Sequence, residues 1–168
     1  MRSKNGQRLA PSDLTGLPLT HTAVIPESYL DEMGHVNVMW YTHFFSDATG
    51  GLFQLYGFTR EHMETNRAGG FALEAHVRYF AELHVGERIS VRSRAVARSA
   101  KRFQHIHFVV NEDDGVIAAT GEFVGAYIDM TTRRMTTIPD DIAAAYDRLI
   151  EEHNRVGWDA PLCGIMRP

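Results

Sequence analysis

The chain has 168 residues, and 44% of them are hydrophobic, which is enough to bury the core of one domain without disulfides or metal ions. Its 21 acidic and 17 basic residues give a formal net charge of -4. A nucleic-acid partner, which requires a strong excess of basic residues, is therefore not expected.

The single cysteine, Cys163, can form neither an intrachain disulfide nor a CxxC metal or redox site, which favours a reducing compartment. Polar residues from Pro11 to Gly16 stand where a signal peptide needs an apolar run, and no stretch reaches membrane-spanning length. We therefore expect a cytoplasmic protein without a membrane partner.

The chain divides into three parts. Residues 1–19 are polar and interrupted by glycine and proline, so we expect a flexible N-terminal arm that contributes little to the core. Residues 20–151 carry the periodic patterns of one folded domain. Residues 152–168 return to glycine, proline and polar residues and are interpreted as a C-terminal tail.

The first elements are a strand, a loop and a long helix. Residues 22–25 alternate and stop at Pro26, which indicates a short strand. Apolar residues then recur at helical spacing over residues 37–56, with Asn37 as the expected N-cap. Gly50 and Gly51 each cost about 1 kcal/mol inside a helix, so we expect them to allow close packing against a neighbour.

The second half changes to an alternating pattern. We expect strands over residues 71–80, 89–98, 103–110 and 116–130, joined by short turns as antiparallel hairpins, and a helix over residues 139–151. A long helix followed by an antiparallel meander predicts an α+β domain whose sheet curls around the helix.

Asp31 stands just ahead of the long helix, where first-turn N–H groups have no intrahelical acceptors and the helix dipole favours negative charge. Gly34 permits a tight turn between them. A carboxylate beside such donors can attack a thioester carbonyl, or activate water against it. By itself the spacing also fits ordinary turn and cap chemistry.

The segment from Asp31 to Tyr41 resembles the D-x-x-G-H-V-N-N-x-x-Y signature of the 4-hydroxybenzoyl-CoA-type hot-dog thioesterases. The resemblance implies a hot-dog fold, in which a curled antiparallel sheet of about five strands wraps a long central helix. It also implies acyl-CoA hydrolysis with Asp31 as the catalytic aspartate and the N–H groups of Val36 to Val38 polarising the thioester. Val38 replaces the usual second asparagine, which leaves only a backbone role there.

Three side chains in or near this segment have alternative roles. His35 can orient the carboxylate or contact the thioester, or only hydrogen-bond to the backbone. Asn37 can cap the helix or position a water molecule. Asp47, in the middle of the helix, either supports the site or lies on an exposed face.

A finer resemblance, to betainyl-CoA thioesterases, is carried by residues 45–49, 74–79 and 101–102. A trimethylammonium group would require aromatic faces and a carboxylate, which Trp40, Tyr41, Phe44 and Glu74 can supply. The alternative is that these aromatic residues belong to the ordinary core.

Arg98, Lys101 and Arg102 lie at one predicted hairpin end, where they can bind the phosphates of CoA, although basic residues on this strand mostly suit a solvated face. His105 and His107 with Glu112 imitate the first metal motif of cupins, but the rest of that motif is missing. We therefore expect no metal and interpret the two histidines as lying on a polar strand face.

The sequence thus predicts an acyl-CoA thioesterase without a cofactor. We expect a homodimer or a dimer of dimers, formed through the apolar second strand, with acyl-CoA as the substrate. The alternatives are a non-catalytic acyl-CoA-binding protein and a hot-dog hydratase or dehydratase. The latter pairs an aspartate with a histidine five residues later, whereas Asp31 and His35 are four residues apart.

Overall fold

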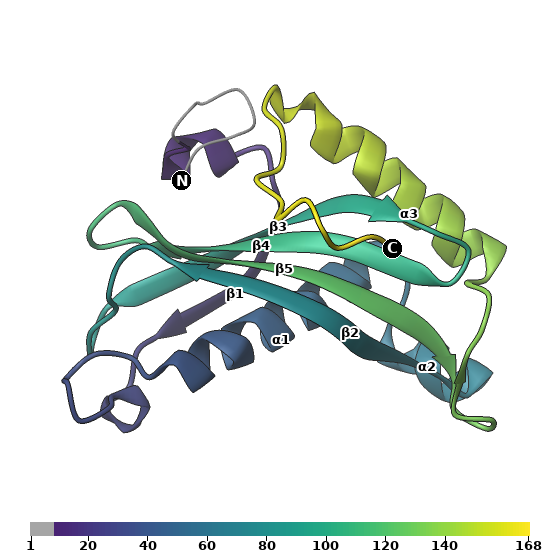
Figure 1. Cartoon of the computed structure of the whole chain (residues 1–168), viewed down its shortest axis with the longest axis horizontal. Helices are drawn as coiled ribbons and strands as arrows, with labels where there is room; N and C mark the ends of the chain where they lie inside the picture. Colours follow the sequence, from purple (N-terminus) through teal and green to yellow (C-terminus); the bar gives the residue numbers. More distant parts are fainter. Residues whose placement is uncertain (1–8) are drawn as a thin grey trace.

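The computed structural model describes residues 9–168, which form a curved sheet with helices on both faces (Figure 1). The helices are α1 (Val38–Leu55), α2 (Arg60–Asn66) and α3 (Asp140–His153). The strands are β1 (Leu19–Val24), β2 (Ala68–Tyr79), β3 (Arg88–Arg98), β4 (Arg102–Asn111), β5 (Val116–Asp129) and β6 (Arg134–Met135).

The sheet has the strand order β1-β3-β4-β5-β2, with every pair antiparallel and the two-residue β6 paired to the end of β5. Helix α1 lies in the hollow of the curved sheet, and α3 lies on the opposite face (Figure 1). The predicted α+β architecture, a long helix wrapped by a curled antiparallel sheet of about five strands, is confirmed.

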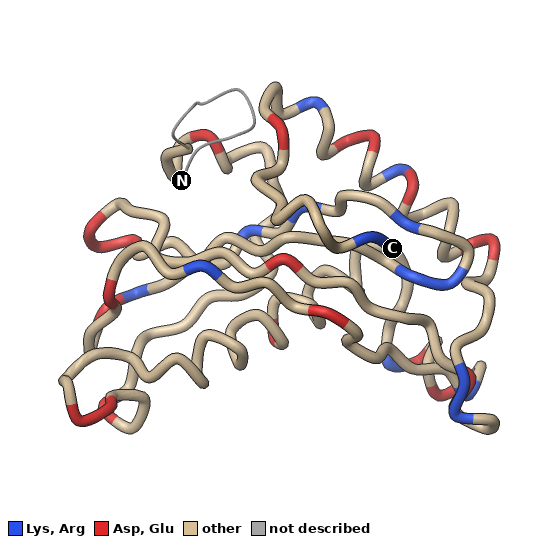
Figure 2. The backbone as a smooth tube through the Cα atoms, viewed as in Figure 1, with Lys and Arg blue, Asp and Glu red and all other residues tan. Residues whose placement is uncertain are grey.

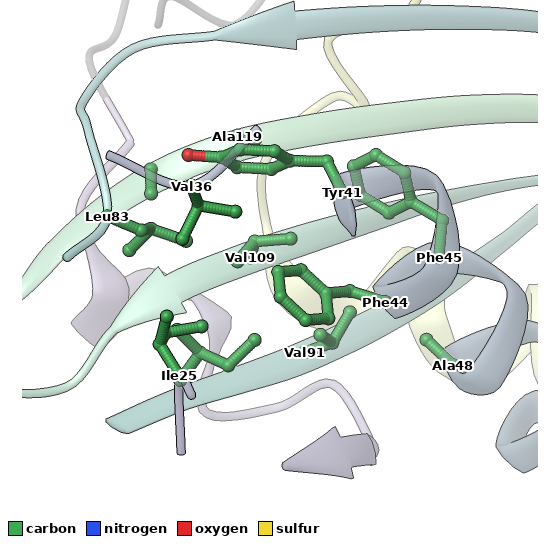
Figure 3. Packing of buried hydrophobic residues seen from close by; sticks show 12 residues of the cluster. Ile25, Val36, Tyr41, Phe44, Phe45, Ala48, Leu83, Val91, Val109 and Ala119 are labelled. Atoms are coloured by element: carbon green, nitrogen blue, oxygen red, sulfur yellow. The ribbon is translucent and has the colours of Figure 1, made fainter. Parts of the chain in front are cut away.

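Helix α1 is held by its buried face and by its cap. Asn37 accepts a hydrogen bond from the N–H of Met39 at 3.0 Å, as predicted for an N-cap, which stabilises a helix by about 1 kcal/mol. Phe44 and Phe45 are at most 1% exposed and pack, with Tyr41, against strands β3 to β5 (Figure 3). Complete burial of one such side chain contributes about 1.5–3 kcal/mol.

The two glycines of α1 differ in their surroundings. A Cβ atom on Gly51 would lie 2.2 Å from the carbonyl oxygen of Thr20, so the absence of a side chain lets α1 approach β1 closely. A Cβ atom on Gly50 would meet nothing within 4 Å. The expectation of close packing is confirmed for Gly51 and wrong for Gly50, which instead borders a cavity.

The ends of the chain contribute more to the core than expected. Leu14 and Leu17 are at most 2% exposed and pack with Phe108 and Trp158 on the face of the sheet opposite α1. This outer face carries apolar side chains of β4 that must be covered. The expectation of a loose arm and tail is therefore wrong for these parts, while residues 1–8 lie outside the described residues.

The same cover explains the arginines of β3. Arg94 is 5% exposed, donates to the carbonyl oxygen of Trp158 at 2.7 Å and lies 4.7 Å from the centroid of its indole ring. Arg92 donates to the carbonyl oxygen of Leu17 at 2.7 Å. The basic face that was predicted to be solvated is therefore partly covered, because two of its arginines bind the N-terminal and C-terminal segments of the chain.

Helix α2 was not predicted, because seven residues are too few to show a clear period. It begins after the N-cap Thr59, whose side chain accepts from the N–H of His62 at 3.2 Å, and it leads directly into β2. None of the helices formed by residues 9–168 has the length and apolarity needed to cross a membrane.

Candidate functional site

The loop that carries Asp31 is closed by its own backbone. The N–H of Asp31 donates to the carbonyl oxygen of His35 at 2.9 Å, and the N–H of Gly34 donates back to that of Asp31 at 3.1 Å. Gly34 has a φ of 83°, a left-handed conformation that glycine adopts without strain. This tight turn fixes the position of the Asp31 side chain ahead of α1.

The Asp31 carboxylate has one oxygen bound and one beside an imidazole. Its Oδ1 accepts from the N–H of Met33 at 2.8 Å, and its Oδ2 lies 3.4 Å from Nδ1 of His35. The side chains of Asp31 and His35 are 24% and 31% exposed. The carboxylate is thus oriented by its own loop and remains open to a small molecule.

Fewer helix-start amides are available than the sequence suggested. The N–H of Val36 donates to Leu83 at 2.8 Å and that of Asn37 to Tyr29 at 2.9 Å, so both are occupied within the protein. Val38 is the first residue of α1, and its N–H therefore has no intrahelical acceptor. Of the three N–H groups expected to polarise the thioester, those of residues 36–38, only the Val38 amide is left for that role.

Two surface hollows flank this helix start. Leu30, Asp31 and Asn37 line the first with neighbouring loop residues, and its volume is about 680 Å³. The second, of about 290 Å³, is lined by His35, Val38 and other residues: Val36, Tyr41, Tyr79, Phe80, Ala81 and Glu82. Asp31 and Asn37 line the first hollow and His35 and Val38 the second, and the two hollows adjoin because Asn37 and Val38 are consecutive residues.

Tyr41 closes the inner end of the second hollow. Its hydroxyl donates to the carbonyl oxygen of Ala81 at 3.4 Å, and its ring meets that of Tyr79 edge-on at 5.1 Å. Burial, together with the nearby Tyr79, raises the pKa of Tyr41 to about 12. Tyr41 therefore keeps its proton at neutral pH and supports the wall of the hollow.

The predicted aromatic cage is not assembled. Tyr41 and Phe44 are 3% and 1% exposed and belong to the core, and the ring of Trp40 is stacked on Tyr29 at 3.6 Å. Glu74 borders a hollow formed with the C-terminal tail, on the face of β2 opposite α1. The alternative, that these residues belong to the core, holds for Tyr41 and Phe44, whereas Trp40 is partly buried against that core.

The three predicted phosphate ligands lie at the β3–β4 turn, at the opposite end of the sheet from the acidic loop before α1 (Figure 2). Helix α1, with 18 residues and a length of about 27 Å, runs between these two ends of the sheet. Arg98 is bound to both carboxylate oxygens of Asp147 at 2.7 and 2.5 Å, and this pairing lowers the pKa of Asp147. Lys101 and Arg102 remain as candidates.

His105 and His107 are buried at 4% and 0% exposure and face α1, so their expected place on a polar face is wrong. Nε2 of His107 lies 2.9 Å from Oγ1 of Thr49, and its Nδ1 lies 2.6 Å from Oγ of Ser93. Burial lowers the pKa of His105 to about 4 and that of His107 well below its usual value. Both rings are therefore neutral at physiological pH.

A cavity of about 400 Å³ opens between α1 and strands β2, β4 and β5, next to these histidines. Sequence analysis missed it, because its lining comes from separate elements: Thr42, Ser46, Thr49, Gly50, Phe53, Phe58, Gly70, Phe71, Ala72, Phe103, His105, Phe123, Val124, Gly125 and Ala126. Its size lies within the range of small-molecule sites.

Two further groups of polar residues lie elsewhere. Asp47 is 42% exposed, with His21 and His43 within 3.8 Å, which matches the expected exposed helix face. His76, Glu122 and Cys163 have potential metal-ligand atoms within 4.8 Å of one another on the outer face. The Glu122 carboxylate is already bound there by Gln104 at 2.8 Å and by the Cys163 N–H at 2.7 Å.

Comparisons with known proteins agree with the fold. A Staphylococcus aureus protein solved in complex with CoA is similar in structure, with a TM-score of 0.75, 22% identity and coverage of 90% of each chain. The betainyl-CoA thioesterase of Pseudomonas aeruginosa is 26% identical over 132 residues, which are 79% of this chain and 82% of that protein.

The L-carnitine dehydrogenase/betainyl-CoA thioesterase of Agrobacterium fabrum is 29% identical over 129 residues. That match covers 77% of this chain, whereas the chain spans only 26% of the length of that relative. The sequence profile of the thioesterase-like superfamily matches residues 25–146, from the end of β1 to the middle of α3. The chain therefore belongs to the thioesterase-like superfamily.

Proposed function

We propose that the protein hydrolyses acyl-CoA thioesters at the start of α1. The Val38 N–H binds the thioester carbonyl oxygen, and the Asp31 carboxylate acts on the carbonyl carbon. The observation that carries the proposal is an oriented, accessible carboxylate in the short loop directly before α1, whose first amide has no intrahelical acceptor. Donors aimed at a developing oxyanion are among the strongest contributions to catalysis.

Two routes lead to the same products. In the first, Asp31 removes a proton from water, and the hydroxide adds to the carbonyl to form a tetrahedral oxyanion bound by Val38. In the second, Asp31 adds to the carbonyl itself, and water then hydrolyses the anhydride. In both, the C–S bond breaks, CoA leaves as a thiolate and the acid is released. Label in Asp31 after a single turnover in ¹⁸O-labelled water identifies the second route, because only attack of water on the aspartyl carbonyl of the anhydride places label there.

The proposal includes a dimer formed through the free edge of β2. Among residues 9–168, β2 is paired only with β5, and its other edge exposes Phe71 at 64% and Tyr79 at 48%. The N–H of Phe80 donates to β5, and since successive residues alternate, the N–H of Val77 points to the free edge. Unpaired edges of this kind are normally covered.

Two-fold pairing of β2 with a second copy would join the two ends of the sheet. Because the two strands would run antiparallel, the Phe71 end of one copy would lie beside the Tyr79 end of the other. The hollow at Val38 would then adjoin the cavity between α1 and the sheet of the second copy. Lys101 and Arg102 of that copy would approach the same end, where we propose that they contact CoA phosphates.

The acyl group that we propose is a small one. The names of two relatives specify betainyl-CoA, whose acyl group ends in a trimethylammonium. We therefore propose betainyl-CoA as a substrate of this chain and would place it first in a panel of acyl-CoA esters.

Val38→Pro tests the amide without removing a side chain that the fold requires. Proline is well tolerated at the first position of a helix, and Asn37, with φ -60° and ψ 140°, already has the extended conformation that suits a residue before proline. We expect the variant to remain folded and to lose about a hundredfold to a thousandfold in kcat, because the oxyanion donor is gone.

Val38→Ala is the matched control, since it shortens the same side chain and keeps the N–H. It should retain most of the release of free thiol from acyl-CoA. Equal activity of the proline and alanine variants would contradict the role of the amide. Binding of acyl-CoA by the wild type without any thiol release would contradict the proposed hydrolysis.

A further inference from the structure

The cavity between α1 and the sheet is lined by aromatic rings from several elements. Five phenylalanines line it: Phe53, Phe58, Phe71, Phe103 and Phe123. The ring centroids of Phe53 and Phe58 are 4.8 Å apart, and His105 is stacked on Phe123 at 5.8 Å. These rings come from α1, the α1–α2 connection and three strands, so the fold brings them together from separate parts of the sequence.

The remaining lining gives the cavity no charge of its own. None of the described residues that line it is an aspartate, glutamate, lysine or arginine. The Thr49 hydroxyl donates to the carbonyl oxygen of Phe45 at 2.8 Å and is contacted by His107, so its hydrogen bonds are largely made. Burial keeps His105 neutral, with a pKa of about 4, and no protonated imidazole opposes a bound cation.

Such a cavity discriminates between ligand charges. Aromatic faces carry negative potential and attract a cation within about 6 Å, most effectively one whose charge is covered by methyl groups and is weakly hydrated. A carboxylate or phosphate would lose its hydration and find no cationic partner there. A primary ammonium is more strongly hydrated than a methylated one, so it would lose more hydration on entering this largely apolar cavity.

We infer that this cavity binds the acyl part of the substrate by the faces of its phenylalanines, and that the acyl group it selects is a short one ending in a quaternary ammonium. The inference rests on the proposed function, because the thioester must lie at the seam, which is the proposed junction of the two β2 strands. There it would lie beside Val38 of the second copy. This cavity replaces the aromatic set first expected at Trp40, Tyr41, Phe44 and Glu74, which the fold does not bring together.

A pair of isosteric substrates tests the inference on the wild-type protein. Betainyl-CoA and 3,3-dimethylbutyryl-CoA have the same shape and differ by nitrogen against carbon, so only the first carries a charge. Because the ammonium also activates its thioester, each kcat/KM is divided by the rate of hydroxide-catalysed hydrolysis of the same compound. We expect the corrected value to be at least about tenfold higher for betainyl-CoA.

Substitutions in the cavity test whether its aromatic rings cause the preference for betainyl-CoA over the neutral ester. Phe53→Leu and Phe123→Leu each keep an apolar side chain and remove an aromatic face from the cavity, so each should lower the corrected preference by at least about threefold. Phe108→Leu is the matched control, since Phe108 is buried on the outer face with Trp158, and it should keep the wild-type ratio. Either cavity variant suffices if the other does not fold.

The outcomes separate this inference from the proposed function. A corrected ratio near one, a preference for the neutral ester, or a ratio unchanged in both cavity variants would overturn the aromatic site while hydrolysis itself still stood. Release of thiol from neither ester, but rapid release from other acyl-CoA esters, would also overturn it. Failure to hydrolyse any acyl-CoA would overturn the proposed function and this inference with it.

Discussion

Acid should destabilise this protein through its buried histidines, well before most carboxylates are protonated. His105 is 4% exposed, and among the described residues its Nδ1 has no hydrogen-bond partner, so nothing compensates for a proton placed there. Its pKa is lowered by burial from 6.5 to about 4. In the unfolded chain the same imidazole is exposed to water and has its ordinary pKa.

The sign and size of the pH effect on the free energy of unfolding follow from this difference in pKa. Between pH 6.5 and about 4 the unfolded state binds a proton that the folded state does not, so the free energy of unfolding falls as the pH falls. The shift corresponds to about 3 kcal/mol for His105 alone. His107, whose pKa is lowered by burial and by His105, acts in the same direction. This loss is a large part of the 5–15 kcal/mol that typically stabilises a domain.

Urea denaturation at fixed protein concentration, repeated from pH 7 to pH 4, measures this dependence. We expect His105→Gln to flatten the curve by about 2–3 kcal/mol across that range, whatever its effect at pH 7. His43→Gln makes the same change at an imidazole that is 46% exposed and should leave the wild-type slope. Parallel curves for wild type and His105→Gln would refute the reasoning.

Other predictions concern the seam, the substrate and the packing of α1. Val77→Pro removes an edge N–H and should convert dimers to inactive monomers in sedimentation equilibrium; a fully active monomer would contradict the shared site. Replacing Lys101 and Arg102 by alanine should raise KM for acyl-CoA more than for the N-acetylcysteamine thioester, whereas equal effects would remove them from the site. Gly51→Ala should lower the melting temperature because its Cβ meets a β1 carbonyl oxygen at 2.2 Å, while Gly50→Ala should not, and equal effects would contradict this packing.

The elements that follow from a strong local period were predictable. The three- and four-residue spacing of apolar residues identified α1, and Asn37 marked its start within one residue. The alternating strands followed for the same reason, because side-chain direction in a strand depends only on position parity. The turn at Asp31 could be located as well, since Gly34 marks a backbone conformation that few other residues adopt.

What the sequence hid depends on contacts between distant segments. The burial of Leu14 and Trp158 requires the outer face of the sheet, which exists only once β4 is paired. His105 and His107 alternate like residues on a solvated strand face, and only the position of α1 makes that face the interior. Glu74 and Tyr41 were grouped because of their chemistry, although they lie on opposite sides of the sheet.

The central claim, that Asp31 carries hydrolysis, is tested most directly by Asp31→Asn. The amide oxygen of asparagine can still accept from the Met33 N–H, so the turn should remain folded while the base or nucleophile is lost. Asp47→Asn, the same change on an exposed face of α1, serves as the control. We predict that thiol release from acyl-CoA falls at least about a hundredfold in Asp31→Asn and stays near wild type in Asp47→Asn. Near-native turnover by a folded Asp31→Asn variant would contradict the account.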